Sequence, residues 1–257
     1  MDDWNPSLYL QFKDERTRPV LDLIAQLKTE PGRVLDIGCG PGNSTAALKA
    51  RFPQAEIIGL DFSETMIERA RAECPGPTFL VGDAGGDLSG LGSFDLIFAN
   101  ASLQWLPNHG ELLHKYVSML TSGGVIAMQV PQYDRMPVSA LIDRIACSPE
   151  YTGFFSDSES GMFFYPDSFY YDTLSPFGAV EMWSTAYFHV LSGHYAIIDW
   201  ISSTGLRPYI ERLPRELQPA FIRDVREGLR QFYPPQEDGK VLFPFSRLFF
   251  ILYKKGS

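Results

Sequence analysis

The chain has 257 residues, of which 45% are hydrophobic and 21% charged, values typical of a folded globular protein rather than a disordered one. With 22 Lys and Arg against 31 Asp and Glu, the formal net charge is −9 and the sequence pI is about 4.9. An acidic chain of this kind repels phosphate backbones and anionic lipids. We therefore expect neither a nucleic-acid partner nor a membrane-surface partner.

The cysteines and the terminal segments indicate the compartment. Cys39, Cys74 and Cys147 are odd in number and scattered, a pattern that predicts a reduced, cytoplasmic protein. No Cys or His group has metal-ligand spacing, so we expect no metal site. The first ten residues lack the apolar run of a signal peptide, and the longest apolar run, 248–253, is too short to cross a bilayer. Nothing in the sequence indicates the oligomeric state.

The first half of the chain alternates short β-branched runs with amphipathic segments. Predicted strands cover 33–38, 55–61, 77–83, 94–100 and 125–130, and predicted helices cover 14–27, 44–52, 64–72 and 111–120. Strands that alternate with helices in this way predict a parallel sheet in an α/β layer arrangement.

The pattern changes after Pro131. The second half predicts a helix at 136–147, an aromatic stretch at 151–171, a strand at 179–191, helices at 194–203 and 214–232, and a terminal strand at 240–255. We expect this half to complete the sheet and to supply a helical lid rather than an independent domain.

The most informative segment is VLDIGCGPGNST (34–45), which joins a predicted strand to a predicted helix. Gly38 and Gly40 let the backbone turn sharply and approach a ligand, and the helix N-terminus offers free N–H groups. A dinucleotide fingerprint that begins at Gly38 would place its third glycine at position 43, which is Asn43. This departure argues against a nicotinamide-dependent dehydrogenase.

Carboxylates mark three successive strands of the predicted sheet. Asp36 lies inside an otherwise apolar strand, Asp61 ends the second strand, and Asp83 ends the third. Because the carboxyl ends of parallel strands meet at one edge, these residues outline a nucleoside site there, with Asp61 placed to accept ribose hydroxyls. Their negative charge suits a cationic ligand better than a pyrophosphate.

These motifs resemble those of the class I methyltransferases that use S-adenosylmethionine. The matching segments are DIGCGPG (36–42), GLDFSETMIERAR (59–71), VGDAGG (81–86) and FDLIFANASLQWL (94–106). The resemblance implies an α/β fold: a Rossmann-like, doubly wound, seven-stranded, mostly parallel sheet with an antiparallel last strand, plus a helical lid. It also implies S-adenosyl-L-methionine as the cofactor.

The same resemblance implies roles for individual residues. The methionyl part would lie against Asp36, Gly38 and Gly40, and the backbone of Asn100 and Ala101 would approach its ammonium group. Asp61 would bind the ribose, with Phe62 and Met66 beside it. Asp83 and the N–H of Ala84 would bind the adenine.

The segments DDWNPSLYLQF (2–12), AIIDWISSTGLRPY (196–209) and LFPFSRLF (242–249) are similar to those of carboxyl methyltransferases that act on trans-aconitate. This similarity implies a small-molecule tricarboxylate substrate. A carboxylate is already ionised at neutral pH, so its methylation needs no general base. Substrate positioning would fall to Arg207, Arg247, Gln104, Trp105 and Tyr9, with Arg16 and Arg18 as further cations.

The resulting expectation divides the chain into three parts. Residues 1–30 would close the site, 31–132 would form the S-adenosylmethionine-binding core, and 133–257 would add the remaining strands and the substrate lid within the same domain. Two further alternatives stay open beside the dehydrogenase. They are a methyltransferase for another small molecule, such as a quinone precursor, and a non-catalytic binding protein that has kept the cofactor fold.

Overall fold

A computed structural model describes residues 13–155, 161–202 and 204–256, with side chains from Thr17 onward in those ranges. The strands are β1 (Arg33–Ile37), β2 (Glu56–Asp61), β3 (Thr78–Val81), β4 (Phe94–Asn100), β5 (Leu120–Pro131), β6 (Gly178–Leu191) and β7 (Val241–Lys254). They form one seven-stranded sheet in the order β3-β2-β1-β4-β5-β7-β6. The strands β1 to β5 are parallel, whereas β7 runs antiparallel to both β5 and β6. The predicted fold class is confirmed.

Helices cover both faces of this sheet. They are α2 (Lys13–Ala25), α3 (Asn43–Arg51), α4 (Glu64–Glu73), α5 (His109–Ser118), α6 (Pro137–Ala146), α7 (Asp167–Leu174), α8 (His194–Ser202), α9 (Arg207–Arg212) and α10 (Gln218–Phe232). Short 3-10 helices are η1 (Ser89–Leu91), η2 (Leu103–Trp105), η3 (Tyr133–Arg135), η4 (Thr152–Phe154) and η5 (Ser175–Phe177). Successive strand residues face opposite layers, so Val34 packs with α2 and α3 while Leu35 packs with α5 and α7.

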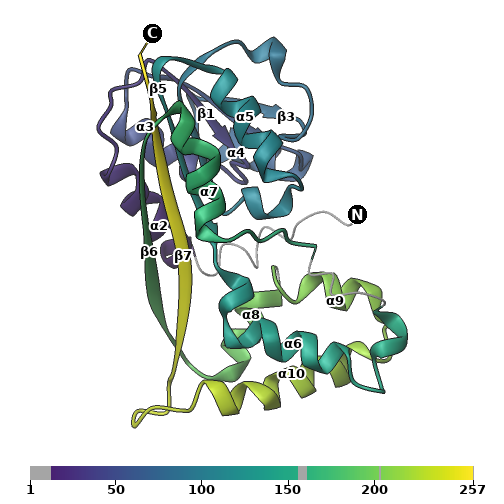
Figure 1. The fold of residues 1–257 in the computed structure, drawn as a ribbon. Helices are drawn as coiled ribbons and strands as arrows, with labels where there is room; N and C mark the ends of the chain where they lie inside the picture. The colour runs from purple at the N-terminus through teal and green to yellow at the C-terminus, as the bar shows by residue number, and fades with distance from the viewer. Residues whose placement is uncertain (1–12, 156–160, 203, 257) are drawn as a thin grey trace.

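The helices α6, α8, α9 and α10 form a separate layer, which we call the lid (Figure 1). The lid has its own apolar core, which includes Leu141, Trp200 and Phe221. Phe243 and Phe245 at the start of β7 belong to the same core. Figure 1 shows β6 and β7 running the length of the molecule, so these two strands connect the sheet to the lid.

The strand order locates the binding edge. The winding of the chain reverses between β1 and β4, because β1 has β2 on one side and β4 on the other. In open α/β sheets, ligands bind beyond the carboxyl ends of the strands at such a reversal. Within the part of the chain that the structure describes, no helix has the length and apolar character needed to cross a bilayer.

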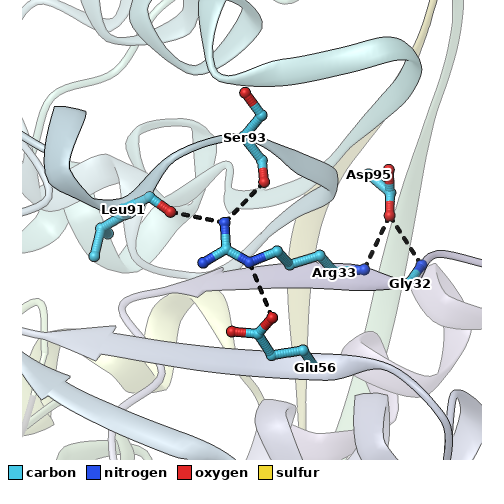
Figure 2. A network of polar contacts seen from close by, with 6 residues as sticks. All are labelled: Gly32, Arg33, Glu56, Leu91, Ser93 and Asp95. Carbon is cyan, nitrogen blue, oxygen red and sulfur yellow. Dashed lines mark hydrogen bonds and ion pairs between the residues drawn. The ribbon is translucent and has the colours of Figure 1, made fainter.

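The opposite, amino-terminal edge is held by a polar network around Arg33 (Figure 2). The Arg33 guanidinium donates from Nη1 to the carbonyls of Leu91 at 2.7 Å and Ser93 at 2.9 Å, and from Nε to Glu56 at 3.1 Å. Asp95 accepts from the backbone N–H of Arg33 at 2.9 Å. These contacts fix the starts of β1 and β4, so this edge has a structural role and the carboxyl-terminal edge is the candidate binding edge.

Several predicted boundaries differ from the structure, and the helix α9 was not predicted. The helix predicted over 111–120 ends at Ser118, because Leu120 pairs with Phe94 on β4 and so begins β5. The sequence analysis predicts no helix between 203 and 214, but Arg207 is the first residue of α9. Pro208 follows it, and proline favours the first turn of a helix, where its missing N–H would have no intrahelical partner.

Candidate functional site

The loop between β1 and α3 turns through three glycines with positive φ angles. Gly38, Gly40 and Gly42 have φ values of 67°, 53° and 90°. A Cβ on Gly38 would lie 2.2 Å from the Cβ of Ser102, so only glycine allows the loop after β4 to pack there. A Cβ on Gly40 would have no described heavy atom within 4 Å. The loop is therefore packed on one side and open to a ligand on the other.

Asp61 ties this loop to the end of β2. Its Oδ2 accepts a hydrogen bond from the N–H of Gly40 at 2.9 Å, and its Oδ1 accepts one from the N–H of Ser63 at 3.0 Å. The carboxylate is half-buried. It therefore lies beside the open face of the glycine loop.

The two residues predicted beside Asp61 lie in different surroundings. Phe62 follows Asp61 directly, and its side chain is 58% exposed. Met66 is buried in the first turn of α4, where its N–H donates to the Ser63 hydroxyl that caps the helix. The structure thus brings Phe62 to the surface of the site and packs Met66 beneath it.

The loop after β3 is fixed by α5. The carbonyl of Ala84 accepts from Lys115 Nζ at 2.8 Å and from the Tyr116 hydroxyl at 3.1 Å. Asp83 is exposed, and its Oδ1 accepts from the N–H of Gly85 at 2.7 Å. The Ala84 carbonyl faces α5, so α5 fixes the position of the loop while the Asp83 side chain remains exposed to solvent.

Asp36, which the resemblance places against the methionyl part of the cofactor, lies inside the fold. It is fully buried, and its Oδ2 accepts from the hydroxyls of Ser44 at 2.7 Å and Thr45 at 2.6 Å. Burial raises the pKa of Asp36 to about 7, although the two hydroxyl bonds act in the opposite direction. The structure therefore places Asp36 between β1 and the first turn of α3, and its Oδ1 is buried with no hydrogen-bond partner among the described residues.

The end of β4 carries two buried acceptors. Ala101 adopts a left-handed conformation with φ 52°, which is rare for a residue with a side chain and typical of strained functional loops. Its carbonyl accepts from Gln104 Nε2 at 2.7 Å. Asn100 Oδ1 and Gln104 Oε1 are buried and have no hydrogen-bond partner among the described residues. A ligand with hydrogen-bond donors would satisfy both.

A pocket opens next to these acceptors, between the sheet edge and the lid. Its empty volume, counted to the open mouth, is about 620 Å³. Trp105, Trp200 and Phe245 give it aromatic walls, while Tyr133 and Arg247 contribute polar groups. Of the described residues that line it, Arg247 is the one cation, and none is a carboxylate or a histidine. The pocket wall thus combines apolar surface with a positive charge.

Gln129 and Phe245 contact Arg247 at the sheet edge. It pairs in register with Pro131, the last residue of β5, and is only 5% exposed. Its Nη1 donates to Gln129 Oε1 at 3.0 Å, and its guanidinium carbon lies 4.7 Å from the centre of the Phe245 ring. Gln104, Trp105 and Arg247, all predicted for substrate positioning, meet in this pocket.

Arg207 lies outside this group. Its Nε donates to Glu211 at 2.5 Å within α9, and it is absent from the described residues that line the pocket. The neighbouring Thr204 and Gly205 line it instead. An i to i+4 pair on one helix explains the difference, because the guanidinium is directed along α9.

Of the three remaining predicted residues, only Arg18 has a side chain in the described part of the protein. Tyr9 and the side chain of Arg16 lie outside the described part of the protein. The Arg18 guanidinium lies 5.4 Å from the centre of the Tyr187 ring, which packs in the core between the sheet and α2.

The sequence interpretation missed Gln129, Tyr133, Trp200, Gly205 and Phe245. Only Gln129 could have been found from the sequence. It is a polar residue inside the apolar strand VIAMQV, just as Asp36 is in VLDIG. The other four are ordinary core or turn residues by type. They reach the pocket only because the lid packs against the sheet edge.

Comparison with known proteins identifies the family. Residues 34–124 match the methyltransferase domain family. A protein of Methylobacterium radiotolerans named trans-aconitate 2-methyltransferase is 42% identical over 260 residues, covering 99% of both chains. A protein of Escherichia coli with the same name is 43% identical over 253 residues, covering 98% of both chains.

Solved structures show the same fold at much lower identity. The YcgJ protein of Bacillus subtilis has a TM-score of 0.63 at 16% identity and covers 93% of this chain and 100% of its own. A methyltransferase-like protein of Bacillus halodurans has a TM-score of 0.58 at 17% identity, covering 94% and 99%. The full-length relatives show that this chain belongs to the trans-aconitate 2-methyltransferase family of S-adenosylmethionine-dependent methyltransferases.

Proposed function

We propose that the protein transfers a methyl group from S-adenosylmethionine to a carboxylate of trans-aconitate or a close tricarboxylate, and so forms a monomethyl ester. The observation that carries this proposal is the buried guanidinium of Arg247 in an aromatic pocket beside the cofactor edge. A guanidinium binds a carboxylate through two parallel hydrogen bonds and stays protonated at any working pH. The names of the full-length relatives support the same substrate.

The residues at the sheet edge fit the cofactor. The glycine loop is open at Gly40, and the buried Oδ1 of Asn100 lacks a described partner, which suits an ammonium group. When bound, S-adenosylmethionine supplies a methyl group on a sulfonium whose sulfur leaves as a neutral thioether.

Each part of the cofactor has candidate partners. Asp61 would accept from the ribose hydroxyls, with Phe62 covering the base. Asp83 and the N–H of Ala84 would bind the adenine amino group and ring. Gly38 and Gly40 would lie along the methionyl chain, while Asp36 and Met66 would support these contacts from within the core.

The substrate supplies its own nucleophile. A carboxylic acid with a pKa of about 4 is an anion at neutral pH, so no residue has to remove a proton. His194, at the start of α8, donates from Nε2 to the carbonyl of Tyr233 at 2.8 Å. This hydrogen bond connects α8 to the end of α10 within the lid. The protein instead orients the substrate carboxylate toward the methyl group. Such positioning alone can supply effective molarities of about 10⁵–10⁸ M.

The aromatic walls favour one second candidate, a methyltransferase for a quinone precursor or another aromatic acceptor. Release of S-adenosylhomocysteine separates the two candidates when the enzyme is offered di- and tricarboxylates and, in parallel, a polyphenol. We expect release with trans-aconitate and far less with the polyphenol. The reverse preference would reject the carboxylate proposal.

A further inference from the structure

Gln129 occupies an unexpected place in the core. Its side chain is fully buried on β5, and the residues two and four positions earlier, Ala127 and Val125, pack in the apolar core between the sheet and α2. Because strand residues alternate, Gln129 belongs to the same face, at the point where that face reaches the binding edge. It is flanked in register by Asn100 on β4 and Phe249 on β7.

Stability alone does not explain a glutamine at this position. Its Nε2 is buried and has no hydrogen-bond partner among the described residues. An unpaired buried amide group costs free energy that an apolar side chain of similar size would avoid. The residue therefore serves a purpose that Leu or Met could not.

The contact that Gln129 makes is with the substrate-facing cation. Its Oε1 accepts from Arg247 Nη1 at 3.0 Å, while the Phe245 ring lies against the guanidinium from another direction. An amide oxygen and an aromatic ring together restrict the orientation of the guanidinium. Neither group adds a formal negative charge, whereas a glutamate of the same length would pair with the cation directly.

We infer that Gln129 is a positioning residue that determines specificity for anionic substrates. It orients Arg247 toward the pocket through a neutral acceptor, so that the guanidinium remains attractive to a substrate carboxylate. This inference rests on the proposed function, because it assigns the Arg247 guanidinium to a substrate carboxylate.

Two substitutions separate orientation from charge. Gln129→Glu keeps the acceptor but adds a competing carboxylate, and Gln129→Met keeps the volume but removes the acceptor. We expect Gln129→Glu to weaken trans-aconitate binding by about tenfold or more and Gln129→Met by less. The effect of Gln129→Glu should shrink for a monocarboxylate of similar size. Affinity for S-adenosylmethionine should change by less than about twofold in both variants.

Gln132→Met is the matched control. Gln132 is also buried, only three residues along the chain, but its amide donates to Asp167 rather than accepting from Arg247. Its substitution should leave trans-aconitate affinity within about twofold of the wild type. Thermal unfolding of every variant shows which of them fold.

Binding is measured by calorimetry in the presence of S-adenosylhomocysteine, so the result does not depend on turnover. Tight binding of trans-aconitate by the wild type without turnover would reject the proposed reaction but leave the role of Gln129 intact. Unchanged affinity in a folded Gln129→Glu variant would overturn the inference. If Gln129→Glu does not fold, affinity in Gln129→Met equal to the wild type would overturn it. Absence of binding by the wild type would overturn both proposals.

Discussion

A Cβ atom on Gly205 would lie 2.2 Å from the hydroxyl oxygen of Tyr133, a distance at which the two groups cannot coexist. Both residues line the pocket, yet they come from different parts of the molecule. Tyr133 follows β5 at the sheet edge, and Gly205 precedes α9 in the lid. The lid can pack this closely against the sheet edge only because residue 205 has no side chain.

This contact makes Gly205→Ala a test of the pocket. The added methyl group should displace the Tyr133 ring into the pocket, so we expect KM for trans-aconitate to rise by about tenfold, equivalent to about 1.4 kcal/mol. Affinity for S-adenosylmethionine should stay the same. Gly153→Ala is the control, because a Cβ there meets no described atom within 4 Å. Equal kinetics for the two variants would show that substrate does not occupy this pocket.

Asp61 can be tested against a matched carboxylate at the opposite sheet edge. Asp61 accepts from the N–H groups of Gly40 and Ser63, and Asp95 accepts from those of Gly32 and Arg33. Hydrogen bonds to charged groups contribute about 1.5–3 kcal/mol each. Asp61→Ala should therefore weaken S-adenosylmethionine binding by at least about tenfold, measured by calorimetry.

The control variant, Asp95→Ala, should lose stability but keep the affinity of the wild type for S-adenosylmethionine. Comparable losses of affinity in the two variants would mean that Asp61 acts through general destabilisation of the sheet. In that case the ribose contact assigned to it would be wrong.

The raised pKa of Asp36 predicts a specific pH dependence of stability. The pKa of Asp36 is ordinarily 3.8, as in the unfolded chain, and burial in the fold raises it to about 7, so between these pH values the native state binds the additional proton. Its contribution to the free energy of unfolding is present at low pH and is lost as the pH rises toward about 7 and beyond. Asp36→Asn keeps an oxygen acceptor for the Ser44 and Thr45 hydroxyls but cannot ionise.

Urea unfolding at pH 5 and pH 8 measures this contribution. The stability of the wild type relative to Asp36→Asn should fall by more than about 1 kcal/mol between the two pH values, since one pKa unit corresponds to about 1.4 kcal/mol. A constant difference between the two proteins would mean that Asp36 does not titrate in this range.

The two arginines predicted for substrate binding should now behave differently. Arg247→Ala should raise KM for trans-aconitate by about tenfold or more, because it removes the cation in the pocket wall. Arg207→Ala should have a smaller effect, since Arg207 pairs with Glu211 outside the described lining. Initial-rate kinetics of both variants test this order. A larger effect at Arg207 would require α9 to reorient its first residue toward the substrate.

The sheet could be predicted from the sequence because its signals are local. The apolar runs give the strands, and Gly38 and Gly40 mark the first turn by requiring a left-handed backbone. The carboxylates at strand ends, Asp61 and Asp83, are also local signals, and they locate the cofactor edge of the sheet. Asp36 shows where this logic fails, because its position was predicted but its burial under Ser44 and Thr45 depends on how α3 packs.

The substrate pocket was less predictable because it depends on packing between distant segments. Arg247 does carry a local signal, because a charge among apolar neighbours in LFPFSRLF needs a partner or a role. Gln129 gave the same kind of signal but lies 118 positions away, and only the pairing of β5 with β7 brings the two together. The contact of Gly205 with Tyr133 has no sequence signal at all.

The product of the reaction tests the central claim most directly. The enzyme is incubated with S-adenosylmethionine and trans-aconitate, and the product is analysed by mass spectrometry before and after mild alkali. The account predicts a compound heavier than trans-aconitate by one methylene group, from which alkali regenerates trans-aconitate because the methyl group is held as an ester. A methylated product that resists alkali, or no methylated tricarboxylate at all, would contradict it.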